Sequence, residues 1–103
     1  MVSFKRASTP VVPKAARLHH YGVAKPSPSS AGHPALVALG AVIRAERLAQ
    51  GLSQEALADK ANIDRSYMGG IERGEHNIAI VNLLKVADAL KVKASTFLEK
   101  SNY

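Results

Sequence analysis

The 103-residue sequence has no cysteine, and this absence excludes disulfide bonds and thiolate metal sites. Long apolar runs are missing too. The longest, from Ala35 to Ile43 with Gly40 inside it, falls far short of the roughly 18 apolar residues that a membrane helix needs. We therefore expect no membrane partner, and the cytoplasm is the default location.

Acidic residues are absent from positions 1–33, which carry five lysines and arginines. Residues 34–103 hold nine basic and eight acidic side chains, so most of the net charge of +6 lies in the N-terminal part. A basic chain favours a polyanionic partner. Because the charge is concentrated at one end, a nucleic-acid-binding role for the rest must depend on particular positions.

Proline is absent after Pro34, and this marks the expected domain boundary. Residues 1–33 contain the other four prolines and show no helical or strand period, so we expect a disordered basic extension there and one folded domain over residues 34–103. The extension has three interpretations. It is an arm that attracts phosphates without sequence preference, an inert extension or, third, a transit peptide.

Apolar residues recur at helical spacing from Ala35 onward and predict an all-α fold. A first helix of about 15 residues should end near Gly51. Ser53 is a suitable N-cap for a second helix, and Asp64 for a third that ends at Gly74.

Two further helices are expected, one over residues 81–90 and a short one over residues 95–99, and no strand is required. The second and third helices, residues 54–61 and those after Asp64, are separated by only about three residues, which forces them to cross steeply. The residues expected to form only the core are Leu39, Ile43, Leu48, Leu52, Leu57, Ile63, Ile71, Leu84 and Leu90.

Four ordered blocks follow this layout. They are Gly51-Leu52-Ser53-Gln54-Glu55-Ala56-Leu57-Ala58, Ile63-Asp64-Arg65-Ser66-Tyr67, Ile71-Glu72-Arg73-Gly74 and Leu84-Lys85-Val86-Ala87-Asp88-Ala89-Leu90. In these blocks the chain resembles the phage Cro and lambda-repressor type of helix-turn-helix domain, which includes the bacterial Xre-like regulators. The resemblance covers Leu36 to Leu98. Its second and third blocks look most like the controller proteins of restriction-modification genes.

The resemblance implies a five-helix lambda-repressor-like fold and a cytoplasmic, bacterial or phage-type transcription regulator. Such a protein binds double-stranded DNA as a homodimer and reads the major groove with a recognition helix, here about residues 64–73. The alternative is an antitoxin-type module that neutralises a toxin or other protein partner and represses its own operon. We expect no enzyme, cofactor or metal, because the sequence contains no catalytic or metal-ligand cluster.

The recognition helix is expected to read bases with its first turn. Arg65 can bond guanine O6 and N7 together, whereas its alternative role is a surface or phosphate contact. Ser66 either meets the DNA or only caps the turn. Tyr67 places its hydroxyl on a phosphate or its ring on a thymine methyl, unless it packs against the second helix.

The flanking positions are expected to contact the DNA backbone. Gln54 would bond a phosphate and brace the recognition helix, or else remain an exposed glutamine. Arg73 is the best of the later candidates, and His76 is otherwise a polar loop residue. The full set of expected DNA-binding residues is Gln54, Asp64, Arg65, Ser66, Tyr67, Gly70, Arg73, His76 and Asn77.

Two features have other interpretations. The resemblance implies that Arg47 and Glu72 form a partly buried ion pair between the first and third helices, with a structural role. Gly69 and Gly70 are unusual inside a recognition helix, where each glycine costs about 1 kcal/mol relative to alanine. Either they let the backbone approach the groove wall or they are tolerated substitutions.

The C-terminal end carries more apolar surface than a domain of this size needs for its own core. We expect a twofold interface there, which would place two recognition helices about 34 Å apart on one face of a near-palindromic operator. The expected interface residues are Val92, Phe97, Leu98 and Tyr103.

Overall fold

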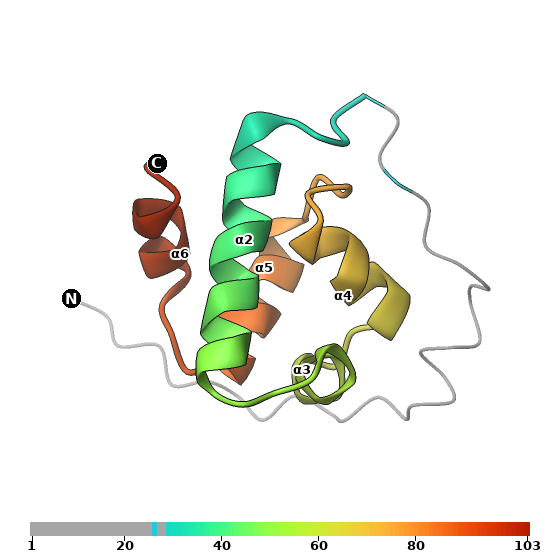
Figure 1. Cartoon of the computed structure of the whole chain (residues 1–103), viewed down its shortest axis with the longest axis vertical. Coiled ribbons are helices and arrows are strands. Elements are labelled where there is room, and N and C mark those ends of the chain that lie inside the picture. Colours follow the sequence, from blue (N-terminus) through green and yellow to red (C-terminus); the bar gives the residue numbers. More distant parts are fainter. Residues whose placement is uncertain (1–25, 27–28) are drawn as a thin grey trace.

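The computed structural model describes residue 26 and residues 29–103, and within these it contains five helices and no strand (Figure 1). The helices are α2 Pro34–Ala49, α3 Gln54–Ala61, α4 Arg65–Glu72, α5 Ile80–Ala89 and α6 Ala94–Lys100. The expected all-α, five-helix fold is confirmed. None of these helices is both long enough and apolar enough to cross a membrane.

Local sequence signals set the ends of α3 and α4. Ser53 Oγ accepts a hydrogen bond from the Ala56 amide at 3.0 Å, and Asp64 Oδ2 accepts one from the Ser66 amide at 3.1 Å. Each such N-cap contributes about 1 kcal/mol to stability. α3 ends at Asn62, whose φ of 60° is left-handed, a conformation that asparagine tolerates. The chain therefore turns sharply between α3 and α4.

α2 is the central helix, with α4 on one side and α6 on the other (Figure 1). α3 packs on α4 and α5, and α5 packs on α6. Gly40 of α2 lies against the last turn of α4, because a Cβ there would stand 2.8 Å from the carbonyl carbon of Glu72. Glycine is needed at this position, since backbone of α4 fills the space of a side chain. The central helix thus supports α4 directly.

Buried apolar side chains from all five helices form one core. The expected core residues that are buried in it are Leu39, Ile43, Leu57, Ile63, Ile71 and Leu90. Leu52 is partly buried against it.

The prediction was wrong for Leu48 and Leu84, whose exposed fractions are 56% and 43%. On α2 the inward position one turn after Ile43 is taken by Arg47, so Leu48 turns outward. On α5 the residue just before Leu84, Leu83, is the buried one. The sequence of α5 has more apolar residues than one helix face can hold, so the pattern alone does not show which of the two adjacent leucines is buried.

Residues 29–33 were expected in the extension, but they form turns that join the domain. The Gly32 amide donates to the Gly74 carbonyl at 2.8 Å, and His33 Nδ1 accepts from the Ala35 amide at 3.1 Å to cap α2. The domain therefore begins before Pro34. The rest of the expected extension, apart from residue 26, lies outside the described residues, so its interpretations stay predictions.

Candidate nucleic-acid interface

The first turn of α4 presents the charged side chain of Arg65 to solvent, next to the N-cap residue Asp64. Arg65 is exposed and, within the described part of the chain, forms no hydrogen bond or ion pair. On either side of it, Ser66 Oγ donates to Asp64 Oδ2 at 2.6 Å. Ser66 is therefore tied to the N-cap residue Asp64, and its contact with DNA stays a prediction. Arg65 is the side chain of this turn that is available to an outside acceptor.

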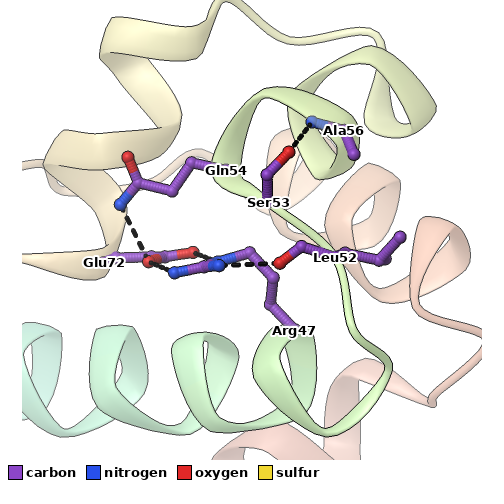
Figure 2. Close-up of polar contacts among 6 residues, drawn as sticks. All are labelled: Arg47, Leu52, Ser53, Gln54, Ala56 and Glu72. Carbon is purple, nitrogen blue, oxygen red and sulfur yellow. Dashed lines mark hydrogen bonds and ion pairs between the residues drawn. The ribbon is translucent and has the colours of Figure 1, made fainter.

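A polar network joins α2, α3 and α4 at Glu72, the last residue of α4 (Figure 2). Arg47 Nε donates to Glu72 Oε2 at 2.7 Å and Arg47 Nη2 to Glu72 Oε1 at 3.0 Å, with side chains only 8% and 2% exposed. Arg47 Nη1 also donates to the Leu52 carbonyl at 2.8 Å. The hydrogen bond with Glu72 raises the pKa of Arg47. The expected ion pair is confirmed, and it is buried.

Gln54 extends this network into α3. Its Nε2 donates to Glu72 Oε1 at 3.0 Å, and Figure 2 shows the side chain reaching from α3 toward α4. The expected bracing of α4 by Gln54 is therefore confirmed. The amide nitrogen carries a second hydrogen, so one donor is not used by Glu72. Contact with DNA phosphate stays a prediction for this residue.

Arg73 ends α4 in an ion pair with Glu75. Its Nε donates to Glu75 Oε2 at 2.7 Å and its Nη2 to Oε1 at 3.2 Å, with side chains 58% and 33% exposed. The hydrogen bond with Arg73 lowers the pKa of Glu75. A forked carboxylate contact of this kind uses the same donors that would bind a phosphate. Asn77, the later candidate, is exposed in the loop that follows.

Gly69 and Gly70 are both buried, so the interpretation that they open the helix backbone to a groove wall is wrong. A Cβ on Gly69 would lie 2.9 Å from Arg73 Nη1 and 3.4 Å from Gln54 Oε1. A Cβ on Gly70 would overlap the imidazole of His76. Neighbouring side chains therefore occupy the space above both glycines.

His76 covers Gly70 and packs on Tyr67. The histidine is 6% exposed, and the ring centroids of Tyr67 and His76 are 4.6 Å apart with an interplanar angle of 40°. Burial lowers the pKa of His76. The Tyr67 hydroxyl accepts a hydrogen bond from Asn82 Nδ2 of α5 at 3.4 Å. The expected direct DNA contacts of Gly70 and His76 are therefore corrected, because both residues are buried within the domain.

The expected dimer surface is only partly exposed. The prediction was wrong for Phe97, because the exposed fraction of this residue is 0% and its ring belongs to the core. Val92 is half-buried, whereas Leu98 and Tyr103 are 40% and 70% exposed. The aromatic ring in this short terminal helix is part of the protomer's own core, so it is not available to a partner.

Sequence reasoning missed a second apolar surface on α5. Ile80, Val81 and Leu84 are 63%, 59% and 43% exposed, and their spacing places them on one face of the helix. The available signal was the number of apolar residues in α5, which is larger than one buried face can hold. Leu83, Val86 and Ala87 already form that buried face.

Comparison with known proteins agrees with this architecture. The family described as helix-turn-helix matches residues 43–97. Among curated proteins, the control protein C.BamHI of Bacillus amyloliquefaciens is 36% identical over 61 residues, which are 58% of this chain and 75% of that protein. The immunity repressor of Bacillus phage phi105 is 40% identical over 58% of this chain and 42% of its own length. For three of the curated relatives that it matches, the phage repressor among them, the chain covers only 42% to 60% of the relative's length.

Solved structures give the same result. The restriction-modification controller protein C.AhdI from Aeromonas hydrophila is 48% identical, with a TM-score of 0.59 over 60% of this chain and 94% of that one. The controller protein C.Esp1396I is 38% identical, with a TM-score of 0.61 over 66% of this chain and 88% of that one.

Proposed function

Since the chain belongs to the helix-turn-helix family of DNA-binding transcription regulators, we propose that it binds a near-palindromic operator as a homodimer, with α4 as the recognition helix. The observation that carries this proposal is the position of Arg65. It is exposed on the first turn of α4, and no described residue engages its guanidinium. An N-terminal arginine of a recognition helix can bond guanine O6 and N7 together in the major groove.

The residues around Arg65 have supporting roles in this proposal. Ser66 and Tyr67 meet the DNA beside it, and Asp64 caps the turn that carries all three. Because Asp64 fixes the backbone of the turn, Arg65 reaches the DNA bases from a rigid helix rather than from a loop.

Phosphate contacts are assigned to residues on both sides of α4. Gln54 has one amide hydrogen that Glu72 does not use, and its side chain is already fixed by Glu72. Arg73 and Asn77 lie at the other end. The N-terminus of α5 has no side-chain cap within the described chain, so its amide groups add an anion-binding end.

The homodimer is proposed to form through the apolar side chains that α5 and the C-terminal end expose. On α5 these are Ile80, Val81 and Leu84, and at the C-terminal end Leu98 and Tyr103 with part of Val92. A group of apolar side chains exposed together is the kind of surface that a protein partner covers. Two copies would present two α4 helices to half-sites about one DNA turn apart.

Selection of bound sequences from a random DNA pool tests the proposal, with the full chain compared against Arg65→Ala. We expect a sequence with two related half-sites, and loss of preference at one guanine per half-site in the variant. Arg44→Ala is the matched control, because it removes the same side chain from an exposed position of α2 that is assigned to neither the DNA-binding surface nor the dimer surface. A uniform loss of binding with Arg65→Ala would make Arg65 a phosphate contact only.

The control of restriction-modification genes is the form of regulation that we propose, because several relatives are named as control or controller proteins. The genes beside this one provide the test. A methyltransferase or endonuclease reading frame next to it would support this form, and a toxin reading frame would support the antitoxin alternative.

A further inference from the structure

Gly70 and His76 are not explained by base reading alone. Gly70 stands inside α4, where glycine weakens a helix because it adds backbone entropy to the unfolded chain. His76 is a polar side chain that is only 6% exposed. Within the described residues, neither of its ring nitrogens has a hydrogen-bond partner. Burying such a group is unfavourable unless another contact compensates.

The two residues fit each other. A Cβ on Gly70 would overlap Nε2 and Cδ2 of His76, so the imidazole can lie there only because position 70 has no side chain. The chain returns to this point through Gly74, whose φ of 74° is left-handed. The Glu75 amide then donates to the Gly70 carbonyl at 2.9 Å and fixes the loop against α4.

Tyr67 is the residue that the imidazole supports. Tyr67 and Gly70 are three residues apart on α4 and therefore share a face. The His76 ring lies against the Tyr67 ring at 4.6 Å, and Asn82 of α5 donates to the Tyr67 hydroxyl. The orientation of the phenol ring is thus held by the loop after α4 and by α5.

We propose that His76 is a positioning residue for Tyr67, an inference that rests on the proposed function. Its imidazole, seated on Gly70, holds the Tyr67 ring in the orientation in which it meets DNA, and it acts without touching DNA itself. A side chain that is already oriented loses less conformational freedom on binding. Removing the histidine ring should therefore weaken operator binding about 2- to 10-fold, which is the range of an aromatic pair.

A double-mutant cycle on the full chain tests this role, with the DNA that the wild-type chain selects as the probe. His76→Ala should weaken binding in the wild-type chain and have no further effect in a Tyr67→Ala chain. In an Arg65→Ala chain it should cost as much as in the wild type, because Arg65 is not held by the histidine. An equal loss in the Tyr67→Ala chain would overturn the proposal, since His76 would then act on DNA directly or through general stability.

Gly70→Ala gives a second cycle. Its Cβ should displace the imidazole and reproduce the loss seen with His76→Ala, and the double variant should bind no worse than His76→Ala alone. Additive losses would overturn the proposal.

The ring contact can also be measured without DNA. His76→Ala should shift the Tyr67 ring proton resonances of the free protein, and unchanged resonances would overturn the proposed contact. A wild-type chain that selects no DNA sequence would instead contradict the proposed function, and the resonance measurement would still report on the Tyr67–His76 contact.

Discussion

Arg47 Nε lies 2.7 Å from Glu72 Oε2 between α2 and α4, where both side chains are almost completely buried. Removing one partner would leave the other charge buried and unpaired. We therefore expect Glu72→Ala to lower the free energy of unfolding by about 3 to 5 kcal/mol. Urea denaturation followed by circular dichroism would measure this change.

The surface pair of Lys100 and Glu46 is the matched control for that prediction. Its Nζ–Oε1 distance is 2.6 Å, but the lysine side chain is 55% exposed, so Lys100→Ala should cost less than about 1 kcal/mol. Replacing both Arg47 and Glu72 by methionine should recover much of the loss, because no lone buried charge remains. If Glu72→Ala cost no more than Lys100→Ala, the buried network would not be a main support of α4.

The fold and the first turn of α4 could be predicted because the sequence features that determine them are local. The caps at Ser53 and Asp64 and the spacing of apolar residues define the helices, and each signal lies within a few residues of its effect. The pairing of Gly70 with His76 was not predictable from spacing. It depends on the path of a loop that folds back on α4. Gly70, which one interpretation left open to the DNA, is therefore covered by the imidazole of His76. The same limit applies to Phe97, whose burial depends on how α6 packs.

The pH dependence of stability should include a contribution from His76. Burial lowers its pKa below the ordinary value of 6.5, so the unfolded chain takes up a proton at a higher pH than the folded chain does. The contribution of His76 to the free energy of unfolding is therefore fully present above pH 6.5, and it is lost as the pH falls through the pKa of His76 in the folded chain.

Urea denaturation at several pH values from 8 to about 5 would measure this contribution. We expect the free energy of unfolding of the wild-type chain to fall more between these limits than that of His76→Asn, which cannot titrate at this position. Glu75 and Arg73 also face the imidazole, and both remain in the variant. Parallel pH profiles for the two chains would show that burial of the imidazole has no effect on stability.

Glu75 should limit the affinity of the chain for DNA, because its carboxylate occupies the donors of Arg73 that a phosphate would use. Glu75→Gln should weaken this competition and remove a negative charge beside the DNA, so binding to all sequences should become tighter. Arg73→Ala should instead reduce the slope of log K against log salt by about 0.9, the value for one phosphate contact.

Fluorescence anisotropy with labelled DNA over a range of salt concentrations measures both effects. Arg44→Ala again serves as the charge control, on α2. An unchanged salt slope with Arg73→Ala would mean that its guanidinium stays with Glu75 in the complex and binds no phosphate.

Substitution of three exposed leucines can show whether the proposed dimer surface binds a second copy or is simply exposed apolar surface. Leu84 of α5 and Leu98 of α6 belong to the proposed surface, whereas Leu48 of α2 does not, although it is the most exposed of the three at 56%. A charge buried in an apolar interface is strongly unfavourable. Leu84→Glu and Leu98→Glu should therefore shift the chain toward monomer in sedimentation experiments, and Leu48→Glu should leave the dimer intact.

Each substitution replaces a side chain that is exposed in the protomer, so Leu48→Glu should have an unfolding free energy within about 0.5 kcal/mol of the wild type. Leu84→Glu and Leu98→Glu should lose, in addition, only the stability that dimer formation contributes. A monomeric variant with an intact α4 should still bind a single half-site, but it should lose the extra affinity that the second half-site gives to a linked pair. If all three variants dimerised as the wild type does, the interface would have to lie on another face. If the wild-type chain were monomeric at tens of micromolar both with and without DNA, the twofold operator itself would be the wrong target, and a single half-site bound by Arg65 and Tyr67 would replace it.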